Sequence, residues 1–281
     1  MIPFATLFRT AAWTAAIALG SPGLCWAEDG PPGVRLASHR AVYDLQLVRS
    51  EGNKAPSEAR GRIALDFSGT PCEGYVQNFR QFTELQSAEG PPRSSDMRSA
   101  TFEDGEGRNF RFKVETNVDQ KPAEATDGQA VRSTDGALSV SLSRPKPTKL
   151  DLDRDVAFPT EHMRRIIAAA RDGKSLYAVK VYDGSETGEK VFDTTSIIGK
   201  AASGPVDDAA SSVPELNGAT RWPVAISYFE EGKKDSQPNY TLSFDLYDNG
   251  VSRALKLDYG DFVLSGKMVK LELLPTKPCE K

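Results

Sequence analysis

Few residues of this chain have the types and spacing that catalysis or metal binding requires. The sequence holds two histidines, His39 and His162, and neither lies in an HExxH pattern or beside a carboxylate at metal-ligand spacing. A serine nucleophile needs an oriented base, and the sequence has no G-x-S-x-G elbow. We therefore predict no catalytic residue, no metal site and no cofactor, and we interpret His162 as a polar residue at the start of a helix.

Four aspartates near the C-terminus offer the nearest approach to catalytic chemistry. Asp245, Asp248, Asp258 and Asp261 could include a carboxylate pair for general acid–base hydrolysis. Aspartates are also common at strand ends and in turns, where they bond to the backbone. A hydrolase of cell-wall or lipid substrates stays as an alternative, which alanine replacement of Asp258, Asp261 and His162 would test.

Aromatic side chains are frequent in the C-terminal third of the chain. Such residues can line a concavity that holds an apolar ligand. The alternative is that they form the ordinary core of a sheet. The possible ligand-lining residues are Trp222, Tyr228, Phe229, Tyr240, Phe244 and Tyr259.

Residues 1–27 predict a secretory signal peptide. Arg9 precedes an apolar run, and small residues stand at the positions that a cut after Ala27 requires. The run is too short to cross a bilayer, which takes about 20 residues. Leu24 before Cys25 does not fit a lipoprotein signal. We expect Sec-type export to the periplasm and a single domain over residues 28–281.

Two cysteines, Cys72 and Cys279, remain after the leader is removed. An exported protein meets an oxidising compartment, where a lone pair of thiols is normally bridged. We predict a structural disulfide that holds the C-terminal strand near the start of the fold. A catalytic or metal-binding thiol is the weaker alternative, because the two cysteines are far apart and no CxxC occurs.

The overall composition excludes two classes of partner. The chain has 35 basic and 39 acidic residues, and the basic residues are scattered and form no long cluster. Nucleic acid calls for clustered lysine and arginine, so a nucleic-acid partner is not expected. After the leader, no apolar run reaches membrane-spanning length, so we expect no stable membrane insertion.

Alternating apolar and polar residues recur along most of the chain. Ala41, Tyr43 and Leu45, for example, alternate with polar side chains, as in a strand with one buried face. Asp248-Asn249-Gly250 predicts a hairpin turn between two strands. The pattern indicates an all-β protein of about a dozen strands, arranged as a highly curved antiparallel sheet in the form of an open barrel or spiral.

One segment breaks this pattern and predicts an α-helix over residues 161–171. Thr160 is the expected N-cap and Gly173 the residue that ends the helix. An apolar stripe on one face would plug the open end or the interior of the curved sheet. A membrane-surface helix is the alternative, although the segment is short and holds only three arginines. The stripe comprises Met163, Ile166, Ile167 and Ala170.

Several segments of the chain resemble the EipB-like cell-envelope integrity proteins of Gram-negative bacteria. They are Ala37 to Leu45, Phe158 to His162, Trp222 to Phe229, Pro238 to Ser252, Leu257 to Phe262, and Cys279. The resemblance covers essentially the whole chain after the leader. It implies a periplasmic open barrel or spiral with short helices, and a disulfide that maps to Cys72 and Cys279. The family has no agreed catalytic residues, so none is transferred.

The leading hypothesis is a non-enzymatic periplasmic factor that supports envelope integrity by binding an envelope component. In a carrier version, the curved sheet holds a lipid, or the acyl chain of a lipoprotein, and the helix acts as a plug or lid. In a scaffold version, the outer face or an edge strand binds an envelope protein, for instance by strand addition. The sequence does not identify the partner.

Overall fold

A computed structural model describes residues 33–52, 55–87, 90–232, 237–276 and residue 279. The predicted leader, with Cys25, lies outside the described residues. In the part of the chain described, all the strands join one 15-stranded sheet. The predicted all-β fold is therefore confirmed, with more strands than the dozen that the alternation suggested.

The strands fall into two runs along the chain. The first run is β1 (His39–Ser50), β2 (Glu58–Thr70), β3 (Gly74–Gln86), β4 (Arg93–Glu103), β5 (Asn109–Val118), β6 (Lys121–Arg132), β7 (Leu138–Arg144) and β8 (Thr148–Leu152). The second run is β9 (Val156–Ala157), β10 (Leu176–Val181), β11 (Phe192–Ile198), β12 (Arg221–Glu230), β13 (Tyr240–Tyr247), β14 (Ser252–Asp258) and β15 (Phe262–Leu273).

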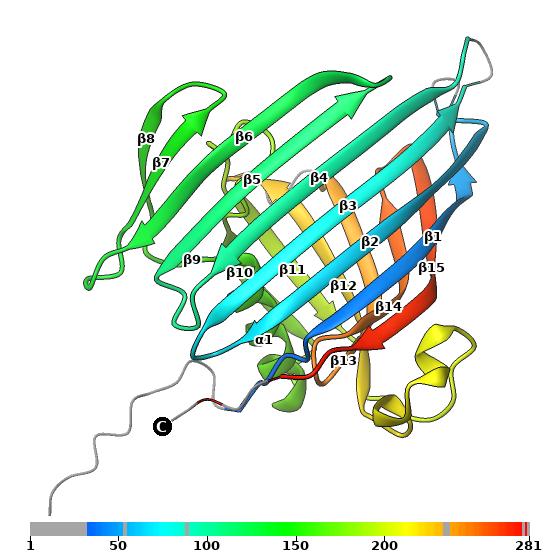
Figure 1. Ribbon diagram of the computed structural model, residues 1–281. Coiled ribbons are helices and arrows are strands. Elements are labelled where there is room, and N and C mark those ends of the chain that lie inside the picture. The colour runs from blue at the N-terminus through cyan, green and yellow to red at the C-terminus, as the bar shows by residue number, and fades with distance from the viewer. Residues whose placement is uncertain (1–32, 53–54, 88–89, 233–236, 277–278, 280–281) are drawn as a thin grey trace, which may run out of the picture.

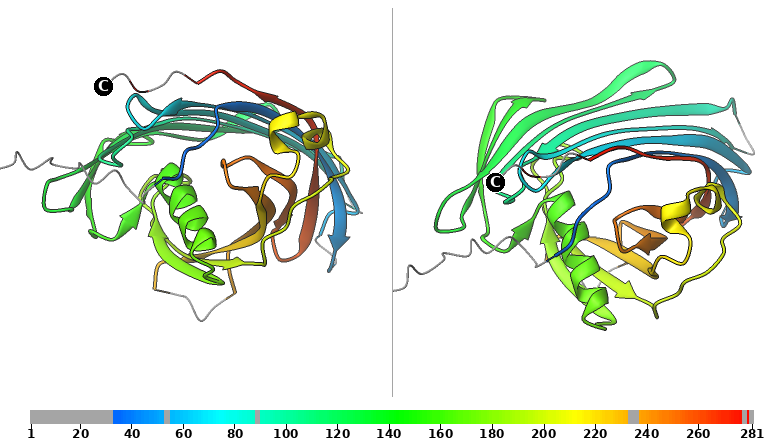
Figure 2. Two further views of the ribbon diagram at one scale, coloured as in Figure 1. Left: turned by 90° about the horizontal axis from the view of Figure 1, so that it is seen from below. Right: turned by 60° about the horizontal axis from the view of Figure 1, so that its bottom comes forward.

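The first and last strands meet in the middle of the sheet. The spatial order is β8-β7-β6-β5-β4-β3-β2-β1-β15-β14-β13-β12-β11-β10-β9. Neighbouring strands are antiparallel except β9 and β10, which are parallel. The sheet curls so that the wall made by β1–β6 faces the wall made by β10–β14 (Figure 1; Figure 2). The result is a nearly closed, barrel-like spiral whose two end strands are β8 and β9.

The predicted hairpin turn lies between β13 and β14. Gly250 has a φ of 87°, which favours glycine. A Cβ atom at this position would lie 2.6 Å from the Leu36 side chain. The turn therefore needs glycine both for its backbone conformation and for the close approach of the segment that precedes β1.

Helix α1 (Pro159–Arg171) lies in the curl, between the two walls (Figure 2). It begins two residues earlier than predicted, because Phe158 and not Thr160 is the N-cap residue. Pro159 occupies the first helical position, where its missing N–H costs nothing. The prediction that Thr160 caps the helix is wrong.

The predicted disulfide joins Cys72 and Cys279. Their Cα atoms are 5.8 Å apart, and 207 positions separate them in sequence. Cys72 lies in the turn between β2 and β3, and Cys279 follows β15. The bond therefore fixes the end of the chain beside the first hairpin of the fold, which confirms the sequence prediction.

A long connection between β11 and β12 packs over the second half of the sheet. It contains two short 3-10 helices, η1 (Ala209–Ser212) and η2 (Pro214–Leu216). Ala210 and Leu216 are buried in a cluster with Tyr43 of β1 and Tyr247 of β13. The buried guanidinium of Arg253 donates to Asp208 at 2.8 Å and so ties this connection to β14.

Candidate functional site

A cavity of about 200 Å³ lies between helix α1 and the two walls of the spiral. Residues from β1–β3, from β10, β12 and β13, and from the first turn of the helix line it. About half of the lining side chains are apolar, and polar side chains lie among them. The lining includes His39, Leu65, Phe67, Gln77, Thr160, His162, Met163, Asp183, Ile226, Tyr228, Leu242 and Asn249.

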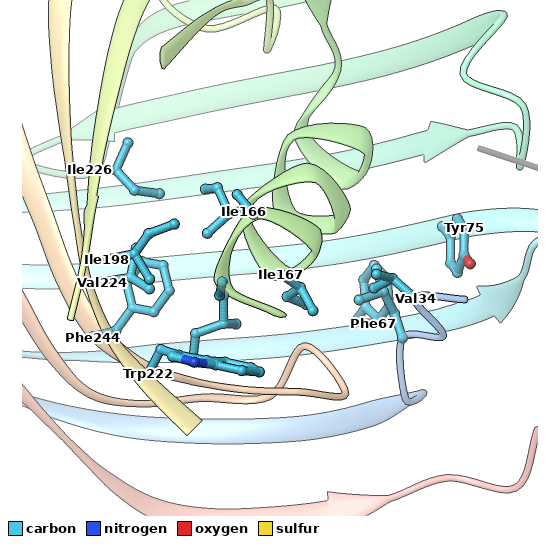
Figure 3. Close-up of a cluster of buried hydrophobic side chains, with 14 residues drawn as sticks. Val34, Phe67, Tyr75, Ile166, Ile167, Ile198, Trp222, Val224, Ile226 and Phe244 are labelled. Atoms are coloured by element: carbon cyan, nitrogen blue, oxygen red, sulfur yellow. The ribbon is translucent and has the colours of Figure 1, made fainter. Parts of the chain in front are cut away.

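The helix forms the floor of this cavity because its apolar stripe is anchored in the core. Ile166, Ile167 and Ala170 are buried in a cluster with residues from both walls. Figure 3 shows Ile166 directed toward Ile226, and Ile167 between Trp222 and Phe67. Met163 packs against this cluster and also lines the cavity. The structure thus places the four predicted stripe residues inside the curl; their role as a plug stays a prediction.

Glu103 of β4 fixes the start of the helix. Its buried carboxylate accepts hydrogen bonds from the backbone N–H groups of Thr160 and Glu161, each at 2.8 Å. These are donors that a helix N-terminus leaves unpaired, and the helix dipole favours an acidic group there. Burial raises the pKa of Glu103 to about 7, although the two hydrogen bonds act to lower it. Sequence analysis missed this residue, because its partners lie more than fifty positions away.

A row of aromatic rings leads away from the cavity along the second wall. Tyr228 lines the cavity, and its ring stacks on Tyr240 at a centroid distance of 4.4 Å. Tyr240 lies 6.4 Å from Tyr259, which in turn lies 4.9 Å from Phe262. Tyr259 is 37% exposed, so the row reaches the surface. Across from it, Gln81 of β3 donates to the Tyr259 hydroxyl at 3.4 Å.

The six predicted ligand-lining aromatic residues are not brought together in one surface. Tyr228, Tyr240 and Tyr259 form the row just described. Trp222 and Phe244 instead pack in the core around helix α1. Phe229 follows Tyr228 in β12, so it points to the opposite face of the strand.

Both histidines of the chain line the cavity, although the sequence placed them on separate elements. His39 enters from β1 and His162 from the helix, and both side chains are buried. Burial lowers the pKa of His39. Burial, with a smaller contribution from the charge of Arg165, lowers the pKa of His162 to about 4. Both rings are therefore neutral at neutral pH. Only the curl of the sheet brings them to one cavity, so no local sequence signal could have shown it.

The aspartates near the C-terminus serve separate structural contacts. Asp245 pairs with Arg253 at 2.7 Å, and Asp248 pairs with Arg171 at 2.6 Å. Asp258 pairs with Arg49 at 3.1 Å. These contacts give each of the three carboxylates a structural partner. Among the residues that the structure describes, no group of three or more metal-ligating side chains occurs.

The curled sheet, the internal helix and the terminal disulfide define a barrel-like protein with a small internal cavity. The chain belongs to the EipB-like family, whose model matches residues 32–275. It is 39% identical over 268 residues to the cell envelope integrity protein EipB of Brucella abortus, covering 93% of this chain and 95% of that protein.

A solved structure shows the same architecture. It is the crystal structure of a beta-barrel-like protein of domain of unknown function DUF1849 from Brucella abortus, with a TM-score of 0.80 and 39% identity. The match covers 86% of this chain and 100% of that chain. Neither relative has a name that includes an enzymatic activity. In the described ranges, no helix has the length and apolar character needed to cross a membrane.

Proposed function

We propose that this protein is a non-enzymatic periplasmic factor that supports cell-envelope integrity by binding an apolar part of an envelope component inside the spiral. The name of the Brucella relative supports the role in envelope integrity. The predicted signal peptide and the Cys72–Cys279 disulfide support an oxidising, exported location. The observation that carries the binding proposal is the cavity beside helix α1 and the aromatic row that leads from it to the surface.

The lining of the cavity suits a ligand that is mainly apolar. Leu65, Ile226 and Leu242 supply aliphatic surface from both walls, and Phe67 and Tyr228 supply rings. Sites for small ligands are typically concave and mostly apolar, with a few placed polar groups that fix orientation. A volume of about 200 Å³ holds only part of a lipid, so the remainder would lie along the row from Tyr228 to Tyr259.

The experiment measures binding of the apolar fluorescent probe N-phenylnaphthylamine to protein purified from the periplasm. We expect the wild-type protein to bind the probe with enhanced fluorescence. Leu242→Phe adds volume to the cavity wall and should weaken binding about tenfold or more. Val48→Phe places the same ring at an exposed position of β1 and should leave binding unchanged. Equal binding by the wild-type protein and Leu242→Phe, or no binding at all, would overturn the proposal.

A second candidate function is a scaffold role, which one surface favours. Leu176 of β10 and Ile197 of β11 are each 60% exposed and face each other across the two strands. In the described part of the chain, β9 pairs with β10 only at Lys180 and Val181. The preceding residues of β10 thus offer a free backbone edge beside an exposed apolar pair, where an extended segment of a partner protein could add as a strand.

The scaffold candidate has its own test. A photo-crosslinking amino acid at position 176 should trap an envelope protein in living cells, and the same group at position 48 should not. Capture that is equal at the two positions would count against a strand-addition site on β10.

A further inference from the structure

We infer that the cavity binds a neutral ligand that carries hydroxyl groups on an apolar body, and that His39 and His162 accept hydrogen bonds from these hydroxyls. The inference rests on the proposed function and specifies the chemistry of its ligand. It follows from the proton position on each imidazole ring and from the polar groups that share the cavity.

A contact with the backbone shows which ring nitrogen of His39 carries the proton. Its Nδ1 lies 2.8 Å from the carbonyl oxygen of Ala37. A carbonyl only accepts, so Nδ1 carries the hydrogen of this bond. Burial lowers the pKa of His39, so the ring is neutral and its Nε2 has a free lone pair. This Nε2 is buried and has no hydrogen-bond partner among the described residues, and the side chain lines the cavity.

The contacts of Thr194 show which ring nitrogen of His162 carries the proton. The Thr194 hydroxyl donates to the carbonyl of Val179 at 2.7 Å. Its oxygen can then only accept from His162 Nε2, which lies 3.4 Å away. Nε2 therefore carries the hydrogen, and Nδ1 of this neutral ring is a second acceptor. Two imidazole acceptors from different elements thus belong to one cavity lining.

The other polar groups of the cavity include both donors and acceptors. The Thr160 N–H is bonded to Glu103, and the Asn249 side-chain oxygen accepts from the Val251 N–H at 3.2 Å. Asp183 accepts from the Ser185 N–H at 2.9 Å, and burial raises the pKa of its carboxyl. Gln77 and Asn249 can donate from their amides, and Ser252 and Tyr228 from their hydroxyls. Among the acceptors, His39 Nε2 is buried without a partner in the described part of the chain, which suits a ligand that donates to it.

The charge of the lining argues for a neutral ligand. Within the described chain, no lysine or arginine lines this cavity. A carboxylate or phosphate would meet imidazole lone pairs and the Asp183 carboxyl without a counter-ion, and burying an unpaired charge is costly. A hydroxyl group can donate to His39 Nε2 at no such cost. An acylglycerol is a neutral molecule that joins hydroxyl groups to an apolar chain.

The test is calorimetric titration of untagged protein with three probes that share one acyl chain. They are monooctanoylglycerol, methyl octanoate and octanoate. We expect monooctanoylglycerol to bind about tenfold more tightly than methyl octanoate, which lacks hydroxyl donors. Octanoate, which is ionised at neutral pH, should bind most weakly. His39→Asn keeps a donor for the Ala37 carbonyl and removes the Nε2 acceptor. It should therefore abolish most of the preference for monooctanoylglycerol without weakening the binding of methyl octanoate.

A second measurement does not depend on a variant. The chain has two histidines, so the nitrogen NMR signals of both rings can be followed directly. Monooctanoylglycerol should shift the signal of the unprotonated His39 nitrogen, and methyl octanoate should not. Equal affinity for the two esters, a preference that survives in His39→Asn, or an unchanged nitrogen signal would overturn the inference but leave apolar binding intact. Binding of none of the three probes would overturn the inference, and the proposed function would then fail as well.

Discussion

The carboxylate of Glu103 accepts a hydrogen bond from the backbone N–H of Thr160 at 2.8 Å, across 57 positions of sequence. This contact joins β4 to the first turn of helix α1. His162 and Met163 of the same helix line the cavity. Glu103 therefore adds a polar anchor for the helix start to the apolar contacts that hold the rest of the helix.

Glu103→Ala should destabilise the protein by about 2 kcal/mol, because it leaves two buried N–H groups of the helix start without partners. The measurement is urea denaturation followed by circular dichroism. Glu106→Ala, which changes an exposed glutamate in the next turn, should shift the free energy of unfolding by less than about 0.5 kcal/mol. Equal stability of the two variants would contradict the role of Glu103.

His162 should make the protein sensitive to acid. Its folded-state pKa of about 4 lies below the ordinary value of 6.5. Between these values the unfolded chain binds a proton that the folded protein does not. The contribution of His162 to stability is therefore full above about pH 6.5 and is lost as the pH falls toward 4, by about 2 to 3 kcal/mol.

The pH effect of His162 is measured as a difference between the wild-type protein and His162→Asn. A difference is needed because Glu103, with its pKa raised to about 7, acts in the opposite direction between about pH 4.5 and 7. The free energy of unfolding of the wild-type protein should fall relative to the variant as the pH decreases. A difference that stays constant with pH would show that His162 is not buried in the neutral form.

The Cys72–Cys279 bond should contribute substantially to stability because it closes a long loop. In the chain-entropy model a loop of this length corresponds to about 5 kcal/mol, and measured values are often smaller. Cys72→Ser and Cys279→Ser should each lower the melting temperature by a similar amount. Alkylation without reduction should leave both wild-type cysteines unlabelled. Labelling of either one, or unchanged melting in the variants, would contradict this role.

Arg253 should hold the connection between β11 and β12 through one buried partner. The Asp208 side chain is 2% exposed, whereas that of Asp207, which also contacts Arg253, is 90% exposed. Asp208→Ala leaves a buried cation with fewer partners and should cost about 3 kcal/mol. Asp207→Ala should cost less than about 1 kcal/mol. Chemical denaturation of the two variants compares them directly, and equal losses would refute the distinction.

Much of the fold could be predicted because its signals are local. The alternation of apolar and polar residues predicted the strands, because successive side chains of a strand point to opposite faces. The Asp248-Asn249-Gly250 turn follows from the backbone conformations that its residues tolerate. The disulfide followed from the presence of two cysteines in an exported chain. In each case the deciding residues are close in sequence or few in number.

The site could not be predicted, because its residues meet only through the curl of the sheet. The predicted start of the helix was wrong: Phe158 is the N-cap residue, and the Thr160 and Glu161 N–H groups donate to Glu103, which lies far away in sequence. Aromatic type alone did not separate Tyr228, which lines the cavity, from Trp222, which packs beneath the helix. The shared cavity of His39 and His162 depends on the pairing of β1 with β15, which local pattern does not specify.

The most direct test of internal binding is mass spectrometry of organic extracts from protein purified gently from the periplasm. The wild-type protein should release a stoichiometric acyl-bearing molecule, and Leu242→Phe, with its cavity partly filled, should release much less. An extract without any acyl species, or equal amounts from the two proteins, would contradict a ligand site inside the spiral.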